Sequence, residues 1–342
     1  MAYQNVSTPR FYVNALEWLS NSTPSSFDSI FNTLPVDLVN TGELSTTINI
    51  IDNLLGDKSF IAILGHNMKT IENYCRLSMD GNYLQFSLGI NIGSTYEQII
   101  PSYDGFTIAK FVAPVDDELI LTFNNVGNFG SILIGNYYDM TVNPNLSLKM
   151  SREYGGIDEL VSYNGSSYTN QAWLKPPAWG EAGAWEIYNN TSYGASNWLN
   201  VDTEVSRSGR KSWDLSFSYI DDSDIFGSNQ MITRISPYTD NQNIDIGYDS
   251  DDVLGYTNED QLIDPDSPES KGFTNNLLTD NNFFSQVWQK TLGGTLPFIF
   301  QPDKDNNNPD QFAICRFAEN SLKVNQTAFN VYDISLKIEE SW

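Results

Sequence analysis

The sequence predicts a mainly β protein with sandwich-like domains and one short helix. Tyr, Phe, Thr, Ser, Asn and Gly are abundant whereas lysine is scarce, and this mixture favours strands and turns over helices. Short apolar runs recur about every ten residues between turn residues such as Asp104-Gly105, a spacing typical of β-sandwiches. The 342 residues are 40% hydrophobic and 13% aromatic, so the chain can form two or three domains with a large core. A disordered chain is excluded because such chains contain few aromatic residues.

The charge balance excludes two classes of partner. The chain has 18 Lys and Arg residues against 43 Asp and Glu residues, which gives a net charge of −25. Such a surface repels phosphate groups, so we expect neither specific nucleic-acid binding nor association with an anionic membrane. The N-terminus lacks the basic and apolar regions of a signal peptide. No apolar run reaches the roughly 18 residues of a membrane span, so membrane insertion is not expected.

The first 150 residues are expected to form an extended arm and then a β domain. Residues 1–40 are assigned to the arm because Pro9 favours extended neighbours and a polar break at 20–26 prevents a long helix. Residues 41–150 are assigned to a sandwich or jelly roll. The expected strands are 48–51, 60–64, 74–79, 84–90, 107–112, 119–123 and 131–138, and 60–64 has the pattern of a buried central strand.

Residues 151–205 are expected to be an aromatic-rich connector without regular elements. Four of the eight tryptophans lie in this connector: Trp173, Trp179, Trp185 and Trp198. These side chains either cover a junction between two domains, anchor a protein partner or stack on a sugar. They are therefore our candidates for glycan or partner binding.

Residues 206–342 are expected to form a second β domain that contains an acidic loop at 237–272. The run 213–220 alternates, which places Trp213, Leu215, Phe217 and Tyr219 on one face of a half-buried strand. These four residues are our candidates for a strand that pairs between subunits. A helix is expected at 281–292, with Asp280 as its N-cap and Gly293-Gly294 as its end, and strands are expected at 296–300, 312–317 and 331–338.

No constellation of residues predicts an enzyme, a cofactor or a metal ion. The only histidine, His66, is expected to be structural because the sequence shows no nucleophile and orienting group around it. Cys75 and Cys315 lie in apolar runs, so we expect buried free thiols rather than a disulfide or a zinc site. Glycoside hydrolysis needs only two positioned carboxylates, and a polysaccharide-degrading enzyme therefore stays as a third hypothesis.

One acidic segment begins like a calcium-binding loop. Residues 303–307 read Asp-Lys-Asp-Asn-Asn, but Asn308 stands where an EF-hand needs glycine, and Ile314 stands where it needs glutamate. We expect an ordinary hairpin turn at 303–310. A calcium site of another kind, there or at 249–252, is the alternative.

Five segments of the chain resemble tail proteins of tailed bacteriophages, of the kind common among marine and freshwater phages. They are MAYQNVSTPRFYV at the start, FIAILGHNM at 60–68, GSILIGNYYDMTVNPNLSLKM at 130–150, GRKSWDLSFSYIDDSDIF at 209–226, and FFSQVWQKTLGGTLPFIFQPDKDNNNPDQFAICRF at 283–317. Residues 60–68 and the flanking strands resemble a galactose-binding-like, discoidin-type jelly roll. The C-terminal order of strand arm, helix and antiparallel strands is similar to the tail-tube-like domain of tube and distal-tail proteins of the baseplate hub.

The resemblance implies a structural protein of the virion tail, made in the host cytoplasm. It implies a ring-forming tail-tip or distal-tail component, commonly a hexamer, which contacts other tail proteins and contributes to tail assembly and host attachment. The alternative is a receptor or decoration module of the virion that binds a glycan on the host cell surface. A stable oligomer distinguishes the first hypothesis, and measurable sugar binding distinguishes the second.

Overall fold

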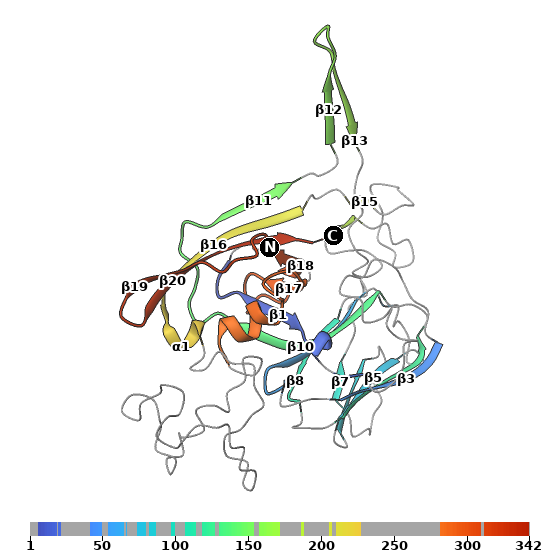
Figure 1. Ribbon diagram of the computed structural model, residues 1–342. Helices are drawn as coiled ribbons and strands as arrows, with labels where there is room; N and C mark the ends of the chain where they lie inside the picture. The colour runs from blue at the N-terminus through green and yellow to red at the C-terminus, as the bar shows by residue number, and fades with distance from the viewer. Residues whose placement is uncertain are drawn as a thin grey trace, which may run out of the picture.

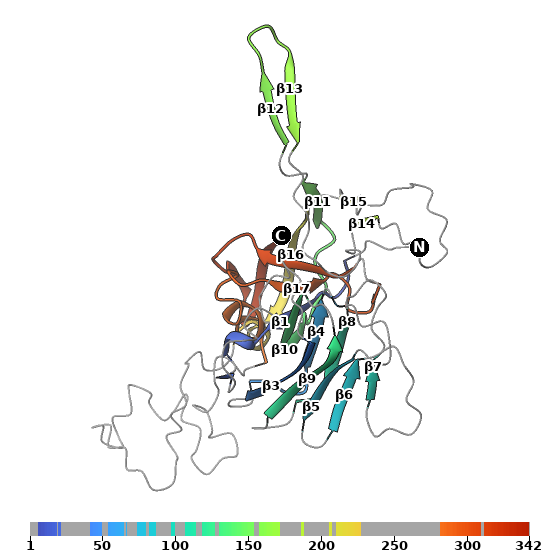
Figure 2. The ribbon, with the colours of Figure 1, turned by 90° about the vertical axis from the view of Figure 1, so that its right-hand side faces the viewer.

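The computed structural model of the chain is mainly β, as the sequence predicts, and has two large sheets (Figures 1 and 2). It describes residues 6–18, 20–21, 42–49, 54–64, 66, 74–79, 82–86, 97–99, 107–113, 118–126, 130–153, 157–171, 186–187, 205–206, 210–226, 281–308 and 311–341. Three short helices accompany the strands in these ranges: a 3-10 helix at Leu16–Trp18, α1 at Asp222–Ile225 and a π-helical segment, η3, at Phe284–Gln289.

The larger sheet has ten strands, all of them antiparallel to their neighbours. In spatial order these are β11 (Lys149–Glu153), β16 (Arg210–Asp221), β20 (Val331–Glu340), β18 (Ala313–Phe317), β17 (Phe298–Gln301), β1 (Arg10–Asn14), β10 (Ser131–Asp139), β4 (Ser59–Leu64) and β8 (Thr107–Phe111), and β19 (Val324–Ala328) pairs with β20.

The smaller sheet has six strands, and two separate hairpins complete the β structure of the described ranges. The six strands are β2 (Ser20–Asn21), β3 (Gly42–Asn49), β9 (Glu118–Val126), β5 (Tyr74–Met79), β6 (Asn82–Phe86) and β7 (Glu97–Ile99). The hairpins are β12 (Ile157–Val161) with β13 (Ser167–Gln171), and β14 (Glu186–Ile187) with β15 (Val205–Ser206).

The ten-stranded sheet crosses the boundaries that the sequence suggests between regions. Strand β1, which falls in the expected N-terminal arm, lies in the middle of the sheet between β10 and β17. All five of its residues are buried. Because β10 and β17 belong to the two expected β domains, the first strand of the chain joins those two regions into one sheet.

The six-stranded sheet packs against one end of the larger sheet and makes a sandwich-like core (Figure 2). The larger sheet contributes mainly aliphatic side chains, including Ile61 and Ile63 of β4 and Ile134 of β10. Leu119 and Leu121 of β9 are among the buried residues that the smaller sheet contributes. Each such side chain stabilises the fold by roughly 1.5–3 kcal/mol when it leaves water.

The other end of the larger sheet encloses an aromatic core around η3. The ring of Phe11 lies 5.8 Å from Phe283, 5.5 Å from Phe298 and 5.3 Å from Phe300, measured between ring centroids. Trp213 packs edge-on against Phe300 with ring centroids 5.2 Å apart. We call this cluster the aromatic core. It lies on the same face of the sheet as the sandwich core, because Ile134 of the sandwich core and Tyr138 of the aromatic core are four residues apart on β10.

Strand β4 is buried on both faces, as expected for a central strand. Its burial is continuous over all six residues. Ile61 and Ile63 face the sandwich core, whereas Phe60 and Leu64 pack with Tyr12 in a third cluster on the opposite face of the sheet. A continuous apolar run rather than an alternating one is the pattern that such burial requires.

The helix expected at 281–292 is present in part, and it ends at Gly293-Gly294 as expected. Asn282 caps its start, since the Asn282 Oδ1 atom accepts a hydrogen bond from the Ser285 N–H at 2.8 Å. Asp280, the expected N-cap, lies outside the described residues. At the other end Leu292 takes the left-handed conformation, with φ of 53°, and Gly293 follows with φ of 67°. The Gly293 N–H bonds to the Trp288 carbonyl at 3.0 Å, which closes a Schellman-type end.

Candidate assembly surface

The structure separates the four strand candidates into two groups. The side chains of Trp213, Leu215 and Phe217 lie in the aromatic core and are at most 2% exposed. Tyr219 does not continue their alternation, because a β-bulge between Phe217 and Ile220 shifts the register. Ile220 turns inward instead, and Tyr219 is 83% exposed. The expectation that Tyr219 shares the buried face is therefore wrong.

The tryptophan candidates Trp173, Trp179, Trp185 and Trp198 lie outside the described residues, as does the acidic loop at 237–272. Part of the expected connector is regular, however. Residues 157–171 form the hairpin β12–β13, and 149–153 form β11 at the end of the larger sheet. The sequence held one signal for this hairpin, the pair Asn164-Gly165, which is a strong indicator of a tight β turn.

The backbone edges expected to pair between subunits are largely used inside the chain. Strand β20 lies between β16 on one side and β18 and β19 on the other. The first part of β16 lies between β20 and β11. In the part of the sheet that the structure describes, the strand order ends at β11, so β11 presents the open edge at this end.

Strand β11 is an exposed edge strand. All five of its residues are exposed, and Met150 is 41% exposed. Its contacts with the body include the ladder to β16 and a side-chain hydrogen bond of 2.6 Å between the hydroxyls of Ser151 and Ser212. An edge strand of this kind offers unpaired backbone groups to another strand.

The hairpin β12–β13 leaves the body beyond β11 and projects away from both sheets (Figures 1 and 2). Its turn is a tight one: the Gly165 N–H bonds to the Ser162 carbonyl at 2.9 Å, and Gly165 has φ of 80°. The Ser162 N–H bonds to the Ser166 carbonyl at 2.8 Å. This combination of a turn and a left-handed glycine is common in hairpins with three-residue loops.

Large apolar side chains of the hairpin are open to solvent. Leu160 is 71% exposed, Val161 is 66% exposed and Tyr163, at the tip, is fully exposed. The two strands pair only with each other within the described ranges. A two-stranded hairpin is at best marginally stable alone in water, so contact with another surface would stabilise it. We call β11 together with β12–β13 the arm.

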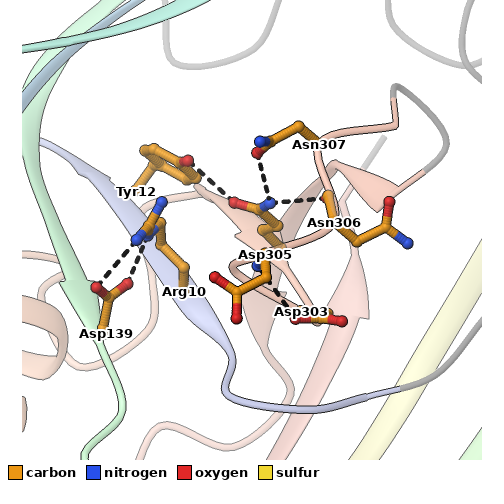
Figure 3. Close-up of polar contacts among 8 residues, drawn as sticks. Arg10, Tyr12, Asp139, Asp303, Asp305, Asn306 and Asn307 are labelled. Atoms are coloured by element: carbon orange, nitrogen blue, oxygen red, sulfur yellow. Dashed lines mark hydrogen bonds and ion pairs between the residues drawn. The ribbon is translucent and has the colours of Figure 1, made fainter.

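A cluster of polar side chains near β1 is held together by hydrogen bonds within the molecule (Figure 3). Arg10 donates two hydrogen bonds to Asp139, from Nε at 2.5 Å and from Nη2 at 3.0 Å. The Tyr12 hydroxyl donates to Gln301 Oε1 at 3.0 Å, and Gln301 Nε2 donates to the Asn306 carbonyl at 2.9 Å. The cluster therefore fastens the loop after β17 to the centre of the sheet.

The loop that begins like a calcium site has the hydrogen bonds of a turn. The Asp303 Oδ1 atom accepts from the Asp305 N–H at 3.1 Å, and the Asp303 carbonyl accepts from the Asn306 N–H at 3.0 Å. Within the described ranges, no group of three or more His, Cys, Asp or Glu side chains is placed to hold a metal ion.

His66 and the two cysteines are buried. The His66 Nε2 atom lies 2.8 Å from the Thr107 hydroxyl. Burial lowers the pKa of His66 to about 3, although a backbone hydrogen bond opposes this shift. Cys75 and Cys315 are free thiols, which confirms the expectation, and burial raises the pKa of both. A thiol with a raised pKa is a poor nucleophile near neutral pH.

No protein-family model, no curated protein and no solved structure matches this chain. Among the residues that the structure describes, no helix is long and apolar enough to cross a membrane. The arm is thus the surface feature on which a functional proposal can be built from the described geometry.

Proposed function

We propose that this chain is a structural virion protein of a tailed bacteriophage, a ring-forming tail-tip or distal-tail component that contributes to tail assembly and host attachment. The observation that carries the proposal is the arm, an exposed edge strand continued by a projecting hairpin with exposed apolar side chains. The resemblance of five sequence segments to phage tail proteins agrees with an assembly role.

The proposal assigns two finer folds. The sandwich-like core, with β4, β8 and β10 on one side and β3, β9 and β5 on the other, corresponds to the galactose-binding-like jelly roll. The aromatic core with β16, β20 and η3 corresponds to the tail-tube-like domain. Both assignments rest on the sequence resemblance together with the sandwich-like arrangement of the sheets.

The arm suits contact between subunits for a physical reason. Backbone N–H and C=O groups at the open edge of β11 can extend a sheet into a neighbour. Leu160, Val161 and Tyr163 can then leave water in the contact, and apolar burial of this kind drives most protein association. In the ring proposed here, the arm of one subunit lies on the next subunit, and other tail proteins contact the faces of the ring.

The test is the mass of the full-length chain in solution, measured by light scattering after size exclusion, together with negative-stain images. We expect a closed ring, with a hexamer as the copy number that the resemblance implies. The triple variant Leu160→Ser, Val161→Thr, Tyr163→Ser should dissociate the ring and leave the far-ultraviolet circular dichroism unchanged.

The matched control is Phe329→Ser, because Phe329 is an 87% exposed apolar residue in the turn between β19 and β20, outside the arm. This control should keep the mass of the wild-type protein. A wild-type chain that stays monomeric at every concentration would overturn ring formation. A ring that survives the triple variant would overturn the role of the hairpin.

One observation favours the alternative, a glycan-binding module of the virion. Tyr219 is an exposed aromatic residue, and the neighbouring Ser218 hydroxyl accepts a hydrogen bond from Asn145 Nδ2 at 3.0 Å. An exposed aromatic face can stack on a sugar ring. A glycan array with wild-type protein and Tyr219→Ala tests this alternative, and binding that Tyr219→Ala abolishes while Phe329→Ser retains it would support it. Absence of binding to any glycan would remove it.

A further inference from the structure

A buried polar junction lies between the sandwich core and the aromatic core. Lys290, which follows η3, is fully buried, and its Nζ atom donates to Gln286 Oε1 at 2.8 Å and to the Leu54 carbonyl at 3.5 Å. Asn136 of β10 donates from Nδ2 to the same two oxygens, at 3.3 Å and 2.7 Å respectively. Leu54 belongs to the sandwich core and Val287 of η3 to the aromatic core, so the junction links the two.

Two further contacts extend the junction along the chain. The Ser59 hydroxyl, at the start of β4, lies 2.7 Å from the Gly56 carbonyl and 3.4 Å from Asn136 Oδ1. The indole N–H of Trp18 donates to the Lys290 carbonyl at 3.3 Å. The 3-10 helix, the segment before β4, strand β10 and helix η3 therefore all meet at Lys290.

The junction is polar but not acidic. Helix η3 contributes only uncharged side chains, and β10 contributes the neutral Asn136, which shares the Gln286 Oε1 acceptor with Lys290. The segment before β4 carries Asp57 and Lys58, and both are exposed. Glu17, on the 3-10 helix, has its side chain outside the described part. Asp139, the carboxylate of β10, pairs with Arg10. Among the described side chains, no carboxylate forms an ion pair with Lys290.

The number of acceptors around Lys290 suits its neutral form. An ammonium group has three N–H donors, whereas a neutral amine has two. Two oxygen atoms accept from Nζ in the described part of the chain, so the ammonium form leaves one donor unsatisfied. A buried charged group without a full set of partners is costly. In agreement, burial lowers the pKa of Lys290 to about 7.

We infer that Lys290 is a proton-operated latch: its neutral amine fastens η3 to β10 and to the segment before β4, and protonation loosens the helix. The sign follows from linkage. The pKa of Lys290 is lower in the closed state than the 10.5 of a solvated lysine, so the open state binds more protons between these values. A fall in pH through this range therefore favours opening of η3, independently of any ring that the protein forms.

Hydrogen exchange on the full-length protein tests the latch. Exchange of amides in 281–296 and in 54–59 is measured between pH 7.0 and 9.5 and corrected for the intrinsic rate, with exchange kept in the equilibrium-opening regime. The opening constant of the wild-type helix should rise as the pH falls, by up to about tenfold per pH unit. Lys290→Met should abolish this pH dependence, and Leu54 O and Gln286 Oε1 keep Asn136 as a donor in that variant.

Lys323→Met is the matched control, because the Lys323 side chain is 70% exposed. It should retain the wild-type pH dependence. His66 does not disturb this window, since it titrates below pH 7 in both states. Equal pH dependence in wild type and Lys290→Met would overturn the latch. Where Lys290→Met does not fold, an NMR titration of the Lys290 Cε signal in the wild type decides, and a pKa above 9 would likewise overturn it.

Discussion

Gly135 of β10 lies directly against the backbone of Val13 in β1. A Cβ atom at position 135 would stand 1.9 Å from the Val13 carbonyl oxygen and 2.8 Å from the Ala15 nitrogen. Both atoms belong to the backbone, so they cannot move aside without separating β1 from β10. The close approach of the first strand to the centre of the larger sheet thus depends on the absence of a side chain at this position.

Gly135→Ala should therefore destabilise the protein by about 3 kcal/mol or more, beyond the typical cost of overpacking. Urea unfolding followed by fluorescence measures the change. Gly56→Ala is the control, because no atom lies within 4 Å of a Cβ built there. The control should change the stability by less than about 1 kcal/mol. A Gly135→Ala protein as stable as the control would show that β1 does not pack as described.

The ion pair of Arg10 and Asp139 should contribute more to stability than a similar surface pair. Their side chains are 8% and 21% exposed, and they face each other across β1 and β10. Asp139→Asn leaves a buried guanidinium without its charged partner, so we expect a loss of about 3 kcal/mol. Glu319→Gln removes the partner of Lys323 in a pair whose side chains are 70% and 51% exposed, and it should cost less than about 1 kcal/mol.

The two variants are compared by urea unfolding at pH 7 and low salt. A further variant, Arg10→Leu with Asp139→Leu, should recover most of the loss because it leaves no unpaired buried charge. Equal costs for Asp139→Asn and Glu319→Gln would contradict the importance that burial gives to the first pair.

Local patterns in the sequence account for many of the strands but not for how they join. The run 74–79 matches β5, and 60–64 and 131–138 match β4 and β10 within one residue at an end. The central place of β1 was not predictable, since its partner strands are far along the chain: Arg10 of β1 pairs with Asp139 of β10 and with Gln301 of β17. Such non-local pairing leaves no trace in the hydrophobic pattern of the strand itself.

The candidate site was likewise predictable in its local elements but not in their arrangement. The turn residues Asn164-Gly165 could have revealed the hairpin, but nothing local shows that it projects from the body. The alternation from Trp213 predicts a half-buried strand correctly and then fails at Tyr219, where a bulge intervenes. Nothing in the sequence indicated that Lys290 is buried, because a lysine at the end of a helix is ordinarily exposed.

The single histidine should make the protein less stable in acid. The pKa of His66 is about 3 in the folded protein and near 6.5 when solvated, so the unfolded chain binds more protons between these values. Stability from this group is complete above pH 6.5 and is lost as the pH falls toward 3, by at most about 1.4 kcal/mol per pH unit. His66→Gln should reduce this slope.

Because the chain contains only one histidine, proton NMR of its imidazole C2–H reports this group directly. We expect no titration between pH 5 and 8 in the folded protein. Thr107→Val is the control, since it removes the hydrogen bond at 2.8 Å and keeps the histidine. It should lower the stability at every pH and leave the slope unchanged. A titration midpoint near 6.5 would contradict the burial of His66.

The bulge in β16 holds Tyr219 in a conformation that costs stability. Its φ is 63°, a left-handed value that costs a residue with a side chain about 1–2 kcal/mol. Asp333 fixes this geometry, since its Oδ1 atom accepts from the Tyr219 N–H at 3.2 Å. Tyr219→Gly relieves the strain but adds backbone entropy to the unfolded chain, which costs about 0.5–1 kcal/mol. The net gain in stability should be about 0.5–1 kcal/mol.

Tyr219→Phe is the matched variant, because it keeps the strained backbone and the ring and removes only an exposed hydroxyl. Its stability should equal that of the wild type, and thermal unfolding monitored by circular dichroism compares the three proteins. A loss of stability in Tyr219→Gly would mean that the side chain packs within the molecule. A gain, together with weaker ring assembly or glycan binding, would show that the exposed tyrosine is kept for a partner at the expense of the fold, as strained residues at functional sites are.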